Sequence, residues 1–171
     1  MAIRKFLTVD DTGATKLMDV GVAHSAGSSD GGKAVVLRPD GTIDSTLLPA
    51  GIGGDTLMMM ASETLNGGDF VNVWDDNGDF KVRKSDASTS GKAAVAFVLD
   101  TASAGELVKI YFEGTNTAVG GATPGVAFLS TTAGGFSSSP PTTSGSVIQQ
   151  VGIGTSATSI NVEFSTPILR A

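Results

Sequence analysis

The chain has 171 residues, a net charge of −6, 40% hydrophobic and 16% charged residues, 23 glycines and no cysteine. This length suits one domain plus an appendage, because domains typically run to about 100–150 residues. The lack of cysteine excludes disulfides, thiolate nucleophiles and cysteine-ligated metals, and the negative charge disfavours sequence-independent binding to nucleic acid. No apolar run approaches the roughly 20 residues that span a bilayer, and residues 1–11 lack the apolar segment of a signal peptide. We therefore expect a soluble chain that is made in the cytoplasm.

The first 32 residues predict an arm with little core of its own. Residues 3–9 and 16–20 are expected strands, whereas residues 21–32 are rich in Gly, Ser and Ala and are expected to become ordered only against a neighbouring subunit. Six apolar residues of the arm have little local core to enter: Ile3, Phe6, Leu7, Leu17, Met18 and Val20. They predict either strand pairing with another protein at a sheet edge or packing on the chain's own body domain.

Residues 31–55, GGKAVVLRPDGTIDSTLLPAGIGGD, predict a connector of fixed geometry. A short apolar strand is expected at residues 34–37 and a tight turn at Asp40-Gly41. One helical turn is expected at residues 44–48, before Pro49 and a cluster of glycines. The domain boundary is expected after residue 54.

The body begins with short strands that are separated by turn signals. Residues 56–62 predict a strand whose three methionines are adaptable core fillers. Residues 70–74 and 80–84 flank an Asn-Gly pair, which predicts a hairpin with a type I′ turn. The continuous apolar run at residues 93–99 predicts a central strand that is buried on both faces.

Further strands are expected in the second half of the body, at residues 107–112, 126–130, 147–151, 159–164 and 167–169. Residues 131–146 form a long Gly/Ser/Thr/Pro segment that predicts an exposed loop. Short strands at regular spacing are typical of sandwiches and barrels. The sequence thus predicts an all-β fold: a small β-sandwich or barrel-like domain (55–171) after an extended N-terminal arm and connector (1–54).

Two short motifs match part of the residue pattern of a ligand site but lack the other residues or elements that such a site needs. In the acidic run at residues 75–79, a calcium loop with Gly78 in sixth position would place Val73 first and Lys84 twelfth, where carboxylates are required. The run therefore predicts a hairpin turn. The GxGxxA spelling at residues 152–157 precedes a strand pattern rather than a helix, so it predicts no dinucleotide site.

The residue types of catalysis and sugar binding are sparse. His24 is the single histidine and lies in the arm, where we expect no scaffold to hold it beside a serine and an aspartate. One histidine alone makes no metal site. Aromatic content of 6% with a single tryptophan argues against a sugar-binding platform, and Trp74 is expected in the core or in a subunit contact. We expect no enzyme activity, no cofactor and no metal.

The connector resembles a recurring segment of tailed-phage virion proteins in its residues GKAVVLRPDGTIDSTLLPAGIGG. The stretches NGGDFVNVWDDNGDFKVRKSDASTSGKAAVAFVL and ELVKIYFEGTNTAVGGATPG resemble the body of phage capsid decoration (cement) and head-fibre proteins. The resemblance implies a non-enzymatic structural protein of the virion that binds the outer head surface as a homotrimer and stabilises contacts between major capsid subunits.

The resemblance also implies the partners and the place of the chain. The partners are the major capsid protein, contacted through the six arm residues, and the chain itself, with no nucleic acid and no membrane. The place is the outer surface of the capsid, after synthesis in the cytoplasm of a bacterial host. The alternative is a neck, tail or fibre component of the virion with host-receptor or glycan binding, for which the loop at residues 131–146 is the expected contact surface.

Overall fold

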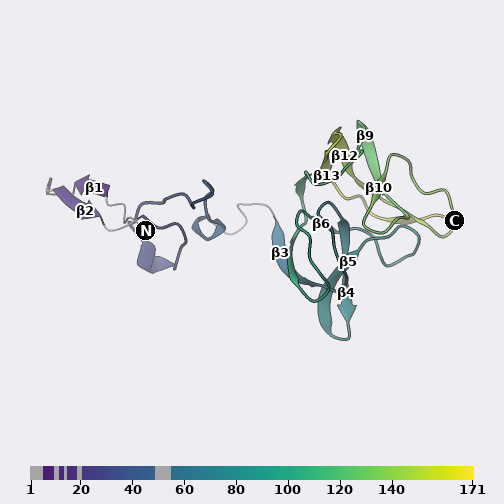
Figure 1. The fold of residues 1–171 in the computed structure, drawn as a ribbon, viewed down its shortest axis with the longest axis horizontal. Helices are drawn as coiled ribbons and strands as arrows, with labels where there is room; N and C mark the ends of the chain where they lie inside the picture. The colour runs from purple at the N-terminus through teal and green to yellow at the C-terminus, as the bar shows by residue number, and fades with distance from the viewer. Residues whose placement is uncertain (1–5, 10–11, 14, 19–20, 49–54) are drawn as a thin grey trace. The chain divides into compact units, whose positions relative to one another are not determined.

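The computed structural model describes residues 6–9, 12–13, 15–18, 21–48 and 55–171, and the chain divides into two compact units, Met1–Gly53 and Gly54–Ala171 (Figure 1). Among the described residues the regular structure is strand, apart from two short 3₁₀ turns. The predicted all-β class is confirmed.

The first unit contains one hairpin and two 3₁₀ turns. Strands β1 (Phe6–Val9) and β2 (Thr15–Met18) pair antiparallel, and the turns are η1 (Ser28–Asp30) and η2 (Ser45–Leu47). The second turn confirms the helical turn expected near residues 44–48.

The strand expected at residues 34–37 is wrong. This segment forms only an isolated parallel bridge between Val22 and Val35, because the glycine-rich segment opposite it offers no longer run of partners. The chain then turns back at once, since Arg38 N–H donates to the Thr42 carbonyl at 2.8 Å. The bridge and its flanking hydrogen bonds join Val22 to residues 34–36 within the unit itself, and the expected need of residues 21–32 for a neighbouring subunit stays a prediction.

The first part of the body is a closed barrel in the order β3-β5-β4-β6-β7. Its strands are β3 (Thr56–Ala61), β4 (Phe70–Asp76), β5 (Asp79–Lys84), β6 (Ala96–Val98) and β7 (Leu107–Tyr111). The barrel closes through a parallel pairing of β3 with β5. At the β4–β5 turn, Asn77 (φ 57°) and Gly78 (φ 98°) both take positive φ, which confirms the predicted type I′ hairpin.

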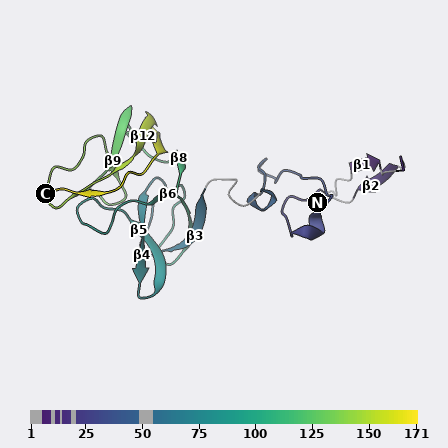
Figure 2. The ribbon, with the colours of Figure 1, turned by 180° about the vertical axis from the view of Figure 1, so that it is seen from behind.

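The second part of the body is an antiparallel sheet in the order β10-β9-β12-β13-β8. Its strands are β8 (Gly114–Asn116), β9 (Gly125–Leu129), β10 (Phe136–Ser137), β12 (Gln150–Ser156) and β13 (Ser159–Val162), and a separate pair joins β11 (Val147–Ile148) to β14 (Ile168–Leu169). Strands β9 and β12 lie at one end of the body and the β4–β5 hairpin at the other, as the view from behind also shows (Figure 2).

Two hydrophobic clusters hold the body together. One fills the barrel and includes Val82 and Ile110, both fully buried. The other joins barrel residues such as Phe70 and Phe97 to sheet residues such as Leu129. Barrel and sheet therefore share a core and form one unit.

Buried amide side chains add directional bonds between barrel and sheet. Gln149, 2% exposed, bonds the backbone of Ala94 twice: its Oε1 accepts from the N–H and its Nε2 donates to the carbonyl, each at 2.8 Å. Asn116 Nδ2 donates to the Gly68 carbonyl at 2.9 Å. These amides satisfy main-chain groups where no strand lies alongside, as buried polar groups require.

Two expectations about buried strands are wrong in part. Of the three methionines on β3, only Met59 is in the core, whereas Met58 and Met60 are 52% and 41% exposed, because successive strand residues face opposite sides and only one side faces the barrel interior. The apolar run at residues 93–99 is a strand only over Ala96–Val98, and Val95 is 39% exposed.

Strand boundaries differ in the second half of the body. The strand expected at residues 147–151 is split into β11 and β12, because Gln149 between them turns its side chain to Ala94. The loop expected at residues 131–146 contains the edge strand β10, and β8 has no counterpart among the expected strands.

Candidate assembly surface

The unit Met1–Gly53 buries no apolar side chain among the residues whose exposure is described. Only Gly21 and Asp44 are buried there. Val35, Leu37 and Ile43 are 56%, 58% and 50% exposed. A small unit has little apolar surface to bury on its own, so the described part of this one is held by hydrogen bonds and leaves its apolar side chains available to a partner.

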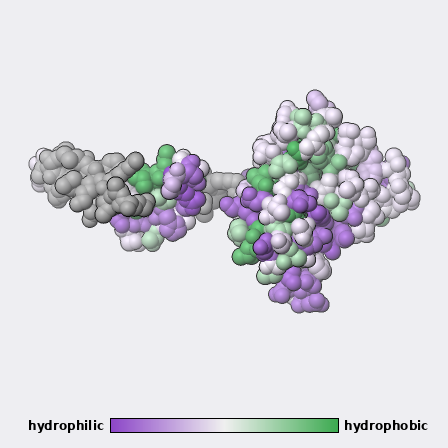
Figure 3. Space-filling view, in the orientation of Figure 1, coloured by the Kyte–Doolittle hydropathy of each residue, from purple (hydrophilic) through white to green (hydrophobic). Residues whose placement is uncertain are grey.

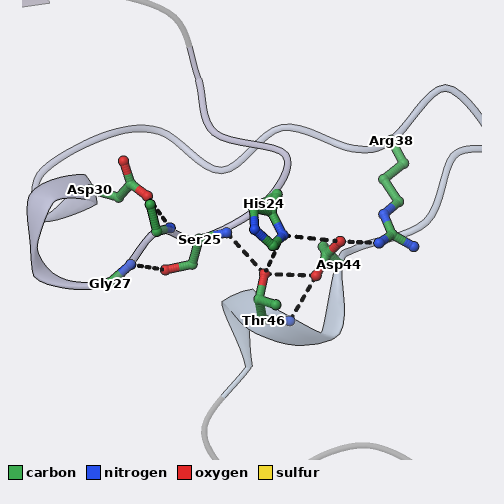
Figure 4. A network of polar contacts seen from close by, with 8 residues as sticks. His24, Ser25, Gly27, Asp30, Arg38, Asp44 and Thr46 are labelled. Carbon is green, nitrogen blue, oxygen red and sulfur yellow. Dashed lines mark hydrogen bonds and ion pairs between the residues drawn. The ribbon is translucent and has the colours of Figure 1, made fainter. Parts of the chain in front are cut away.

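A polar network centred on Asp44 holds the connector together (Figure 4). Asp44 Oδ1 accepts from the Thr46 N–H at 2.8 Å and from the Thr46 hydroxyl at 2.7 Å, while Arg38 pairs with Oδ2. The Ser25 N–H donates to the Thr46 hydroxyl oxygen at 2.9 Å. Three segments separated in sequence are thereby tied to one carboxylate that is 2% exposed.

This environment lowers the pKa of Asp44 from 3.8 to about 2, through the hydrogen bond from the Thr46 hydroxyl, the bond from the Thr46 N–H and the positive charge of Arg38, against an opposing effect of burial. A carboxyl with a lowered pKa stabilises the folded form above its unfolded pKa and loses that contribution as the pH falls through the folded value. The stabilisation is therefore complete above pH 3.8 and is lost between pH 3.8 and about 2.

We expect Asp44→Asn to release the connector at neutral pH, because the neutral amide loses the ion pair with Arg38 and half of its acceptor capacity. Amide NMR signals of Ser25 and Thr46 report this directly. Asp40→Asn is the matched control, since Asp40 accepts hydrogen bonds from the N–H and hydroxyl of Thr42, two residues away, and from no other side chain or N–H in the described part of the chain. Unchanged Ser25 and Thr46 signals in Asp44→Asn would show that the network does not hold the connector.

The expectation that no scaffold holds His24 is wrong. Its Nδ1 lies 3.3 Å from the Thr46 hydroxyl and 3.8 Å from Asp44 Oδ2. Both contacts reach the same ring nitrogen, whereas a nucleophile–histidine–acid relay needs its partners on opposite nitrogens. The arrangement is thus a structural one.

The β1–β2 hairpin carries four of the six predicted contact residues. Its register sets Phe6 opposite Met18 and Leu7 opposite Leu17. The predicted contact residues are therefore paired with one another in the ladder. The other two predicted residues, Ile3 and Val20, lie outside the described residues.

The main-chain edges of this hairpin are available for pairing. Among the described residues, neither β1 nor β2 pairs with a third strand. A two-stranded hairpin is marginally stable alone in water, and an unpaired edge is a template for a strand of another chain. The hairpin is therefore a candidate element for strand pairing with another chain.

A second apolar surface lies on the outside of the barrel, which we term the β3–β7 face and define by Met58, Met60 and Leu107. These side chains are 52%, 41% and 63% exposed, and Met60 stands opposite Leu107 in the ladder. Apolar surface gathers on the side of the body where β3 runs (Figure 3). Sequence reasoning missed this face, although the alternation along residues 56–61 was the signal that separates Met58 and Met60 from Met59.

Trp74 is half-buried on the outside of the barrel rather than in the core. Its Nε1–H donates to the Ser62 hydroxyl at 3.1 Å, and the Arg83 guanidinium lies 4.8 Å from the ring centroid. The prediction of a core position is wrong, and the prediction of a subunit contact stays open.

Other kinds of site are not found in the described part of the chain. No group of three or more His, Asp or Glu side chains there is placed to hold a metal ion. The helical segments that are described there are too short to cross a membrane.

No family model and no curated protein matches the sequence of this chain. A proposal about its role therefore rests on the hairpin, the polar connector and the exposed apolar surfaces.

Proposed function

We propose that this chain is a non-enzymatic structural protein of a phage virion, a capsid decoration (cement) protein that binds the outer head surface as a trimer. The observation that carries the proposal is the first unit: the residues whose exposure is described bury no apolar side chain, and neither strand of its hairpin pairs with a third strand among the described residues. The resemblance of residues 31–55 to virion proteins supports the same role.

The proposed contacts divide between the two units. The β1–β2 hairpin adds to a strand of the major capsid protein, where main-chain hydrogen bonds give affinity and the apolar pairs give specificity. The β3–β7 face contacts another copy of the chain. Linked weak contacts then act as one strong attachment, because each later contact forms at high effective concentration.

A neck, tail or fibre component is the second candidate, because the same hairpin would anchor the chain at any of these positions. The two candidates differ in copy number. A shell-wide decoration protein occurs at hundreds of positions, while a neck, tail or fibre component occurs at a handful.

The test is the molar ratio of this chain to the major capsid protein in purified virions, measured by mass spectrometry with labelled standard peptides. We expect a ratio near one or a simple fraction of one. A few copies per particle would contradict the decoration role and would assign the chain to the neck, the tail or a fibre.

A further inference from the structure

A hollow of about 480 Å³ opens in the body domain beside β9 and β12, and we term it the β9–β12 pocket. Its walls come from β9, from Gly154 of β12 and from the loops at residues 120–123 and 130–138. This volume falls within the range of about 300–1,000 Å³ that is typical of small-molecule sites. The pocket lies within one unit.

The side chains around the pocket are uncharged. Five of its thirteen lining residues carry hydroxyl groups, namely Thr123, Ser130, Thr132, Ser137 and Ser138. The larger apolar side chains among the thirteen are Val126 and Phe136. The pocket therefore combines many neutral hydrogen-bonding groups with one aromatic ring.

Main-chain bonds fix one wall of the pocket, and close backbone packing fixes the other. On one side the Ser130 N–H donates to the Gly135 carbonyl at 3.1 Å, and Phe136 pairs with Leu129 in the β9–β10 ladder. On the other side Gly154 lies so close to the Thr123 carbonyl that no side chain fits between them. A preformed pocket spares a ligand the cost of ordering it.

Several hydroxyl groups of the pocket are free to bind a ligand. Ser130 and Ser137 each accept an N–H locally, at 2.9 and 3.2 Å, and so keep their own proton to donate. The side-chain hydroxyls of Thr123, Thr132 and Ser138 make no hydrogen bond to the described part of the chain, and these residues are exposed.

The lining selects among ligand classes. It has no cationic side chain for a phosphate or carboxylate and no carboxylate for a cation. Glycines and hydroxyl residues dominate it, which disfavours a purely apolar ligand. A neutral sugar matches both the hydroxyl side chains and the aromatic ring of the pocket. Its hydroxyl groups bond hydroxyl side chains, and its apolar C–H face packs on an aromatic ring.

We infer that the β9–β12 pocket binds a neutral saccharide, with Thr123, Thr132 and Ser138 taking the sugar hydroxyls and Phe136 its apolar face. The inference departs from the sequence-based expectation that the low aromatic content argues against a sugar-binding platform. Trp74 is engaged with Ser62 and Arg83, and the ring of the pocket is that of Phe136, which is half-buried and also packs against the hydrophobic cluster of the body. The inference does not rest on attachment to the capsid, and part of the pocket belongs to residues 131–146, the contact surface expected for the glycan-binding alternative.

The test is a titration of the isotope-labelled full chain, followed by amide NMR shifts, with glucose, galactose, mannose and N-acetylglucosamine as probes. We expect saturable shifts at residues 120–123 and 130–138 with at least one of these sugars at millimolar concentration. Glucuronate is the charged comparison and is expected to give none.

Two variants test whether the amide NMR shifts arise from binding in the pocket. Gly120 lines the pocket, does not have a positive φ and has open space where a Cβ would stand, so Gly120→Phe adds a ring at the pocket wall without backbone strain and is expected to abolish the shifts. Thr132→Val removes one hydroxyl at constant shape and is expected to weaken binding by about threefold to tenfold. Thr158→Val, in the β12–β13 turn, is the control and is expected to change nothing.

The inference is overturned if none of the four neutral sugars gives saturable shifts in the wild-type chain. It is equally overturned if Gly120→Phe binds as the wild type does, if the shifts lie outside the pocket, or if glucuronate binds as tightly as the neutral sugars. Virion copy number has no bearing on these outcomes, so the failure of one proposal is distinguishable from failure of the other.

Discussion

Replacing Gly154 by alanine is expected to destabilise the body domain by about 3 kcal/mol, a typical upper cost of forcing an extra methyl group into a packed site. Gly154 is buried on β12, and a Cβ there would collide with the carbonyl group of Thr123. The added Cβ would meet main-chain atoms rather than the end of a flexible side chain. The clash can therefore be removed only if the segment before β9 moves as a whole.

The expected shift in the midpoint of thermal unfolding is about 10 °C downward, and fluorescence of Trp74 in the barrel reports it. Gly120→Ala is the matched control, since that glycine has ordinary φ and nothing stands within 4 Å of the added Cβ. It should leave stability unchanged or raise it slightly by restricting the unfolded chain. A normal midpoint for Gly154→Ala would show that the Thr123 segment yields, and would also remove the argument for a preformed pocket.

The turns and the fold class could be predicted from short residue patterns in the sequence. The Asn77-Gly78 turn follows from the positive φ that these two residues tolerate, and the barrel shows it. The alternation of short strands and turn signals was likewise enough to predict an all-β domain. These features depend on neighbours in the chain, which the sequence displays directly.

Features that depend on distant partners could not be predicted in the same way. Gly152 and Gly154 spell part of a nucleotide motif, but their need for glycine comes from Asn161 and Thr123, which approach them in space. The split between β11 and β12 arises because Gln149 bonds Ala94, 55 residues away. None of these three contacts has a signal in the neighbouring sequence.

In the candidate site, too, some features could be predicted from the sequence and others depend on residues far apart in the chain. Phe6 and Leu7 were singled out because the arm offered little core, and their role as contact residues stays a prediction; the residues of their unit whose exposure is described bury no apolar side chain. The network around His24 was missed, because the Asp44 carboxylate and Thr46 hydroxyl reach it across about twenty residues of loop. Hydrogen bonds between loops leave no periodic pattern in a sequence.

The double variant Phe6→Asp, Leu7→Asp is expected to abolish binding to capsid heads that have been stripped of this chain. Phe6 and Leu7 are adjacent on β1 and stand opposite Met18 and Leu17 in the register, so the two substitutions place a charge in each of two neighbouring pairs of the ladder. Burying an unpaired carboxylate against a partner costs several kcal/mol, which is enough to prevent attachment. Co-sedimentation of the purified variant with the stripped heads measures the loss.

The matched control is Ile168→Asp, Leu169→Asp, which changes two adjacent apolar residues in another short antiparallel pair. These residues are 63% and 61% exposed on β14 of the body, so the control should bind as the wild type does. Unfolding of the body, followed by Trp74 fluorescence, should stay normal in the arm variant, because the arm and the body are separate compact units. Retained binding would exclude the hairpin as the attachment element. Loss of the body's unfolding transition would instead show that the hairpin packs on its own body domain, the alternative that the sequence left open.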